Sequence, residues 1–186
     1  MYKMKKNLIA VSAILALVIW GVYDYYQNGA DNASMQQNAE DAEVGIRIGN
    51  KAPDFTLYDL EGNSVKLSDF DGKKRMVNFW ATWCPPCRVE MPHMQRIWDD
   101  YGEDDVVILA VNLTHTEKNS EVIQQFAQQY DLTFPIVLDE KGDITVEYQV
   151  FAYPTSYMID SSGIIRQRFQ GAVNYEVMRK ALRQMN

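Results

Sequence analysis

Residues 75–101 constrain the fold of this chain more than any other segment. Residues 75–81 form an apolar run of buried-strand length, and from Pro85 to Tyr101 apolar or long side chains recur at helical spacing. Between the two patterns stands Cys84-Pro85-Pro86-Cys87. A fold that accommodates this segment ends a buried strand directly at the N-terminus of a helix and places two cysteines at that junction.

Further strand and helix patterns alternate along the chain. Apolar positions from Phe55 to Leu67 alternate with polar ones around Glu61-Gly62-Asn63, which indicates a β-hairpin. We expect additional strands at 106–111, 135–138, 156–160 and 164–169, and additional helices at 120–130, 144–148 and 174–184. This order predicts one α/β domain with a mixed sheet covered by helices on both faces.

Residues 1–26 have the pattern of an uncleaved membrane anchor. Three lysines precede residues 7–23, which carry no charge and as a helix reach about 25 Å, close to the hydrocarbon thickness of a bilayer. Trp20 and three tyrosines close the segment, as aromatic residues do at a membrane interface. A cleaved signal peptide and a buried core helix are the alternatives.

The lysines also predict an orientation for a single-pass protein of the cell membrane. By the positive-inside rule the N-terminus is cytoplasmic and everything after Tyr26 is extracytoplasmic. Residues 27–45 are polar and small, which indicates a flexible linker, and residues 46–186 form the globular domain. The net charge of −7 argues against a nucleic-acid partner.

The spacing of the two cysteines favours chemistry over a structural role. A disulfide between residues three apart closes a very short loop and adds little stability. At a helix N-terminus the partial positive charge favours Cys84 as the attacking thiolate, and Cys87, one turn later, can reach it. The alternative is a zinc site completed by His93 and His115, since structural zinc usually has four protein ligands. His93 lies only six residues after Cys87 and the sequence has no second Cys-x-x-Cys pair, so we expect no metal.

The motif resembles a known family. Residues 77–87 resemble the active-site strand and helix of thioredoxin-fold proteins, and Trp83-Cys84-x-x-Cys87-x-x-Glu90-Met91-Pro92 is similar to the TlpA/ResA-like family of membrane-anchored extracytoplasmic thiol–disulfide oxidoreductases. Further similarity, reaching from Ile46 to the C-terminus, lies at Gly49-x-x-Ala52-Pro53-Asp54-Phe55-Thr56-Leu57, Leu67-Ser68-Asp69-Phe70 and Tyr153-Pro154-Thr155. The resemblance implies a thioredoxin-like fold with an N-terminal β-hairpin extension.

The same resemblance implies roles for individual residues. Cys84 corresponds to the nucleophile and Cys87 to the resolving thiol of a redox-active disulfide. Pro154 corresponds to a cis-proline that faces the dithiol, and substrate contacts are expected from Trp83, Pro86, Tyr153 and Pro154. The implied partners are a disulfide-bearing client protein and an integral-membrane thiol electron carrier, and no cofactor is implied.

Glu90 is a candidate proton carrier. In cytoplasmic thioredoxins an aspartate on the preceding strand accepts the proton of the inner cysteine, but the matching residue here is Asn78, which cannot. Glu90 follows Cys87 by three residues and therefore shares its helical face. If partly buried, Glu90 has a raised pKa and can exchange protons with Cys87. The alternative is a solvated charge or a partner for Arg88.

Several functions fit these residues. The first is reduction of disulfides in exported proteins, for which apocytochrome c and cell-envelope or spore proteins are typical family clients. A disulfide-forming oxidase uses the same dithiol, since Pro85-Pro86 does not fix the reduction potential. A peroxidase is disfavoured because peroxiredoxins need threonine three residues before the cysteine, where this chain has Ala81. The last alternative is a membrane-tethered binding module with inert cysteines.

Overall fold

The computed structural model describes residues 15–23, 42–102 and 105–185, in two units. In the first, Met1–Asp41, residues 15–23 are helical. Among the described residues no helix is both long and apolar enough to cross a membrane. The rest of the predicted anchor and most of the predicted linker lie outside the described residues. The second unit begins at Ala42, slightly before the predicted domain boundary at Ile46.

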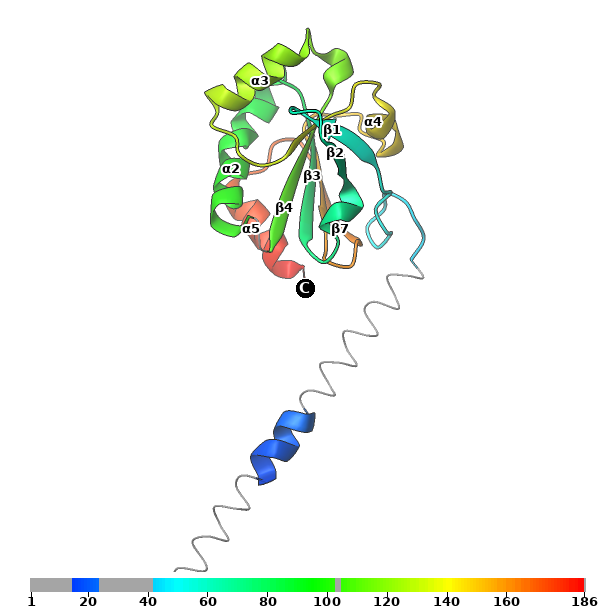
Figure 1. Ribbon diagram of the computed structural model, residues 1–186, viewed down its shortest axis with the longest axis vertical. Coiled ribbons are helices and arrows are strands. Elements are labelled where there is room, and N and C mark those ends of the chain that lie inside the picture. The colour runs from blue at the N-terminus through cyan, green and yellow to red at the C-terminus, as the bar shows by residue number, and fades with distance from the viewer. Residues whose placement is uncertain (1–14, 24–41, 103–104, 186) are drawn as a thin grey trace, which may run out of the picture. The chain divides into compact units, whose positions relative to one another are not determined.

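The globular unit is built on a seven-stranded mixed sheet in the order β2-β1-β5-β4-β3-β6-β7 (Figure 1). The strands are β1 (Thr56–Asp59), β2 (Ser64–Lys66), β3 (Lys74–Trp80), β4 (Val106–Asn112), β5 (Ile136–Leu138), β6 (Thr155–Ile159) and β7 (Ile165–Gln170). The predicted α/β class and mixed sheet are confirmed. Each predicted strand is present, with ends shifted by a residue or two, because strand ends depend on pairing partners that a local pattern does not reveal.

The strand that leads to the two cysteines lies inside the sheet. β3 pairs in parallel with β4 and antiparallel with β6, and six of its seven residues are buried. All seven residues of β4 are buried. Near-continuous apolar runs of this kind are typical of strands that are covered on both faces. The end of β3 at Trp80 is therefore a rigid support for the residues that follow it.

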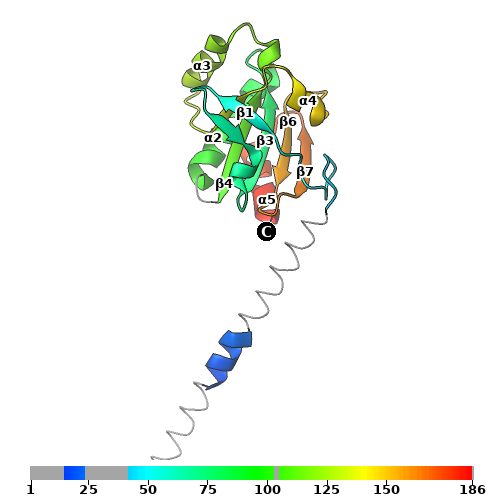
Figure 2. The same cartoon turned by 45° about the vertical axis from the view of Figure 1, so that its right-hand side comes forward.

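Helices cover both faces of the sheet, as predicted. They are α2 (Pro85–Tyr101), α3 (Ser120–Gln129), α4 (Asp143–Glu147) and α5 (Tyr175–Gln184), with short 3-10 turns η1 (Leu67–Phe70) and η2 (Thr114–Thr116). Helices α2, α3 and α5 lie on one face and α4 lies on the other (Figures 1 and 2). The two faces are visible in β3, where Trp80 contacts Phe126 of α3 and Phe79 contacts Tyr148 beside α4.

The N-terminal hairpin of β1 and β2 extends the sheet. β1 pairs antiparallel with both β2 and β5, so the hairpin forms one edge of the sheet. Its turn is held by the Asp59 carboxylate, which accepts hydrogen bonds from the main chain of Glu61 and Asn63. The hairpin is also tied to the core, because the Tyr148 hydroxyl donates to the Pro53 carbonyl at 2.5 Å.

Candidate active site

Cys84 and Cys87 form a disulfide at the first turn of α2, with a Cα–Cα distance of 5.3 Å. Cys84 is the N-cap residue, and its sulfur accepts a hydrogen bond from the main-chain N–H of Cys87 at 3.3 Å. Pro85 and Pro86 occupy the first two helical positions, where the fixed φ of proline suits a helix start. The local sequence therefore places both sulfurs where β3 has just ended and α2 begins.

The two cysteines differ in accessibility. Cys84 retains 3% of its surface, whereas Cys87 is fully buried. Around Cys84 the exposed neighbours are Trp83, with half its surface accessible, and the two prolines. An incoming disulfide therefore meets Cys84 and an apolar rim, while Cys87 stays behind it.

Glu90 lies on the buried side of α2. The side chain is fully buried, and its two oxygens accept hydrogen bonds from the Asn78 amide at 3.1 Å and from the Val173 main chain at 3.2 Å. Loss of water around the carboxyl raises the pKa of Glu90 to about 7, although both donors act in the opposite direction. The predicted burial and raised pKa are present, and the alternative of a solvated helix charge is wrong.

Asn78 joins three elements at this point. Its Nδ2 atom, on β3, donates to Glu90 of α2 and also to the Ser156 hydroxyl of β6 at 2.9 Å. Its Oδ1 atom is buried and has no hydrogen-bond partner among the described residues. Asn78 therefore supplies donors to its neighbours, and the group that can take a proton here is Glu90.

The loop before β6 contacts Trp83, the residue that precedes Cys84, through Tyr153. The Tyr153–Pro154 peptide is cis, and the Pro154 carbonyl accepts a hydrogen bond from Gly171 at 2.8 Å. The ring of Tyr153 meets the ring of Trp83 edge to face, with centroids 6.0 Å apart. Phe151, two residues earlier, is 83% exposed. The surface at this loop is thus rich in accessible aromatic side chains.

Comparison with known proteins identifies the family of the chain. Residues 48–168 match the AhpC/TSA family. The thioredoxin-like protein YneN of Bacillus subtilis is 44% identical over 149 residues, which cover 80% of this chain and 86% of that protein. The thiol-disulfide oxidoreductase ResA of Bacillus cereus is 35% identical over 182 residues, or 98% of this chain and 99% of ResA. The chain belongs to the ResA-like thiol–disulfide oxidoreductases.

Solved structures agree with this assignment. StoA from Bacillus subtilis superposes with a TM-score of 0.62 at 34% identity, over 69% of this chain and 96% of StoA. A putative thiol:disulfide interchange protein DsbE from Chlorobium tepidum gives a TM-score of 0.68 at 32% identity, over 74% of this chain and 96% of that protein. The thioredoxin-like fold of this oxidoreductase and its enzymatic class are thereby confirmed.

The structure gathers the predicted site residues of the oxidoreductase from two stretches of sequence. Trp83, Cys84, Pro86 and Cys87 lie at the start of α2, and Tyr153 and Pro154 lie on the loop that leads into β6. Contact between Trp83 and Tyr153 joins the two stretches at the surface. Below the surface, Asn78 connects Glu90 to β6.

Glu117 lies beside the site, although no sequence pattern predicts it. Its carboxylate accepts hydrogen bonds from the Thr82 main chain and the Thr82 hydroxyl, both at 2.6 Å, and from the Asn112 amide at 3.1 Å. Glu117 and Thr82 are 35 residues apart and belong to no shared motif. Thr82 could be noticed because it lies two residues before Cys84. No feature of the sequence indicates that Glu117 is its hydrogen-bond partner.

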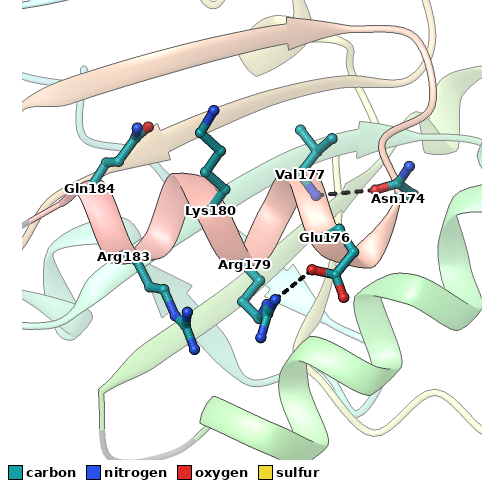
Figure 3. Close-up of a pocket in the computed structure, with 7 residues that line it drawn as sticks. All are labelled: Asn174, Glu176, Val177, Arg179, Lys180, Arg183 and Gln184. Atoms are coloured by element: carbon teal, nitrogen blue, oxygen red, sulfur yellow. Dashed lines mark hydrogen bonds and ion pairs between the residues drawn. The ribbon is translucent and has the colours of Figure 1, made fainter.

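Two other features of the oxidoreductase lie apart from the dithiol. A hollow of about 500 Å³ is lined by residues of α5 and its N-cap, among them Asn174, Arg179 and Arg183, and includes no predicted site residue (Figure 3).

Within the described residues, no group of three or more His, Cys, Asp or Glu side chains is placed to hold a metal ion. His115, one of the zinc ligands considered, instead contacts the Asp139 carbonyl through its ring.

Proposed function

We propose that this oxidoreductase reduces disulfides in selected exported proteins, with its catalytic domain held outside the cell membrane by residues 1–26. The observation that carries the proposal is the Cys84–Cys87 disulfide at the first turn of α2, where Cys84 alone reaches the surface. The clients we expect are apocytochrome c or proteins of the cell envelope or spore. Electrons come from an integral-membrane thiol carrier.

The reaction proceeds by two thiol–disulfide exchanges. The Cys84 thiolate attacks one sulfur of the client disulfide, forms a mixed disulfide and releases the first client thiolate. The Cys87 thiolate then attacks the Cys84 sulfur, breaks the mixed disulfide and releases the second client thiolate. The client gains two electrons, the dithiol becomes the Cys84–Cys87 disulfide, and the thiol carrier reduces it again.

In this scheme Glu90 accepts the proton of the Cys87 thiol and later returns it. Cys87 is fully buried, and a buried thiol gives up its proton to water only with difficulty. Glu90 lies one helical turn further along the same face, and its pKa of about 7 lets it accept and return a proton near neutral pH. The carboxyl is thus matched to the second exchange, in which Cys87 must become a thiolate.

The client binds over the accessible apolar side chains near Cys84. Trp83, which precedes Cys84 in the chain, and Tyr153, whose ring contacts that of Trp83, supply apolar contact, and Pro86 adds an exposed face at the helix start. The Tyr153–Pro154 peptide is cis, and we expect the backbone of its loop to face the dithiol, where an extended client segment can pair with main-chain groups. A locally unfolded protein segment with a disulfide fits this surface.

The proposal is tested by trapping the client. In Cys87→Ser the mixed disulfide through Cys84 cannot be resolved, so it accumulates in cells and is identified by mass spectrometry after non-reducing electrophoresis. The Cys84→Ser/Cys87→Ser double variant is the control. Recovery of exported proteins from Cys87→Ser alone supports the proposal, and absence of any Cys84-linked protein contradicts it.

The direction of electron flow needs its own measurement. A midpoint potential below that of the glutathione couple supports a reductase, since the reduced dithiol then gives its electrons to client disulfides. A potential well above that couple supports the disulfide-forming alternative. Equilibration with glutathione or dithiothreitol mixtures, read by alkylation of the free thiols, gives the value directly.

A further inference from the structure

Thr82 and Trp83, the two residues directly before Cys84, are both hydrogen-bonded to the short segment Thr116-Glu117. Glu117 accepts hydrogen bonds from the Thr82 N–H and the Thr82 hydroxyl, and the Trp83 Nε1–H donates to the Thr116 hydroxyl at 3.0 Å. Residues 81–84 join β3 to α2 without regular secondary structure. Within this segment the Cys84 N–H donates to the Ala81 carbonyl at 3.3 Å, and the side-chain hydrogen bonds to Glu117 and Thr116 add to the support of Thr82 and Trp83.

The segment that provides these contacts is itself firmly supported. Asn112, fully buried at the end of β4, donates to the Glu117 carboxylate, and the Thr116 hydroxyl donates to the Leu113 carbonyl at 2.7 Å. β4 lies next to β3 in the sheet. Glu117 and Thr116 thus connect the residues that precede Cys84 to the end of β4 in the sheet.

We infer that Glu117 is a positioning residue of the oxidoreductase, which fixes Thr82 and Trp83 so that the Trp83 ring and the Cys84 sulfur face a protein disulfide in a defined arrangement. Hydrogen bonds to a carboxylate are about twice as strong as neutral ones. Three of them converge on Glu117, two from Thr82. The inference rests on thiol–disulfide exchange at Cys84, and it is independent of the client and of the direction of electron flow.

Two variants of Glu117 separate position from charge. In Glu117→Gln the amide oxygen still accepts from the Thr82 and Asn112 N–H groups, and the amide nitrogen can donate to the Thr82 hydroxyl. Glu117→Ala loses all three bonds. Both variants lose the negative charge, so any purely electrostatic effect on the Cys84 thiolate is the same in the two.

The experiment measures two rates with the pre-reduced full-length protein. One is reduction of insulin disulfides, which requires a protein to approach Cys84, and the other is alkylation of Cys84 by iodoacetamide, which does not. We expect Glu117→Gln to reduce insulin within about twofold of the parent, and Glu117→Ala to be slower by about tenfold or more, as for a misplaced reacting group. Alkylation changes by the same factor in both variants.

Control variants keep the result interpretable. Glu121 is an exposed carboxylate in the first turn of α3, so Glu121→Gln and Glu121→Ala should leave both rates unchanged. Thr82→Val keeps the main-chain N–H bond to Glu117 and loses the hydroxyl bond. It should therefore slow insulin reduction in part, and this test remains if Glu117→Ala fails to fold. Thermal unfolding of each variant sets a temperature at which all are folded.

Three results overturn the inference. Equal slowing of insulin reduction by Glu117→Gln and Glu117→Ala assigns the effect to charge. Unchanged rates in folded Glu117→Ala, with only a lower melting temperature, assign it to stability. Full additivity of Thr82→Val and Glu117→Ala shows that the two side chains act separately. Failure to trap a client in cells leaves these measurements untouched, since insulin serves as the substrate.

Discussion

Glu90 is a buried acidic residue whose environment differs strongly from water. Its carboxyl is fully buried and accepts two hydrogen bonds from the described residues, one from Asn78 and one from Val173. An ionised carboxylate in such a place loses more from desolvation than two donors restore, and the pKa therefore rises to about 7. A group in this state couples the stability of the fold to pH.

Replacing Glu90 by glutamine should remove that coupling. In the parent protein the folded pKa exceeds the unfolded value, so folding binds a proton, and stability falls as pH rises from about 4.5 to about 7. Above pH 7 the ionised group costs about 3 kcal/mol or less. Urea unfolding at pH 4.5 and pH 8 should therefore show that Glu90→Gln gains stability relative to the parent only at the higher pH. A constant difference across this range contradicts the raised pKa.

The same variant tests the proton role of Glu90. If Glu90 takes the proton of Cys87, the resolving step of the parent has a pH profile with an inflection near 7. Glu90→Gln should lose this inflection and slow the step at pH 7 by about a hundredfold. Stopped-flow decay of a preformed mixed disulfide through Cys84 measures it. Unchanged rates and thiol pKa values would show that Glu90 has no part in the exchange.

The sequence reveals such residues unevenly. Cys84, Cys87 and Glu90 lie in one helical stretch, so their spacing alone predicts a shared face and the burial that follows from it. The Val173 N–H that contacts Glu90 and the Glu117 carboxylate that holds Thr82 come from distant segments. Neither contact follows a local period, so only the folded chain reveals them.

At the scale of elements, a helix or strand can be predicted from the sequence when its apolar residues repeat over several turns or positions. The helix predicted from Pro85 to Tyr101 has those bounds in the structure, because prolines mark its start and apolar residues repeat through four turns. The turn η2, only three residues long, has no period to detect. Nor does the hairpin pattern show that β1 pairs with β5, since that pairing joins residues about eighty positions apart.

Tyr148 connects the segment before the hairpin to α4 and to the central strands of the sheet. It is fully buried at the end of α4, its ring contacts Phe55, Phe79 and Tyr157, and its hydroxyl donates to the Pro53 carbonyl. The segment that leads into β1 is thereby fixed to the face of the sheet that α4 covers.

Removing the Tyr148 hydroxyl should weaken this attachment without disturbing the packing. Tyr148→Phe keeps the ring and leaves the Pro53 carbonyl without its donor, which costs about 1–3 kcal/mol. Tyr58→Phe, an exposed tyrosine of β1, is the control and should be nearly neutral. Denaturant unfolding with an unchanged m-value checks the prediction, and equal stabilities of the two variants would contradict it.

At the scale of the whole molecule, the globular unit from Ala42 onward contains the complete sheet and the dithiol. Residues 1–26 then serve attachment alone under the proposed topology. The full-length protein should remain in the membrane fraction after alkaline carbonate washing, and a reporter fused to its C-terminus should be active only outside the cytoplasm. Release of a processed form that lacks residues 1–26 would show a cleaved signal peptide instead.

The two prolines at the start of α2 have an electrochemical consequence. Proline has no N–H, so Pro86 at the second helical position cannot donate to the Cys84 sulfur, and among the described residues the donor to this sulfur is the Cys87 N–H. A thiolate with fewer donors is less stable, which disfavours the reduced dithiol and lowers its midpoint potential.

Restoring one donor should reverse this effect. Pro86→Ala places an N–H at the second helical position, which an N-cap side chain can reach, and should raise the midpoint potential by about 30 mV for each tenfold gain in stability of the dithiol. Pro85→Ala restores an N–H at the first position, outside that reach, and serves as the control. Equal potentials for Pro86→Ala and the parent would contradict the argument. If this argument holds, Pro86 withholds one hydrogen-bond donor from the Cys84 sulfur, and the dithiol should then give up its electrons more readily than it would with alanine at that position.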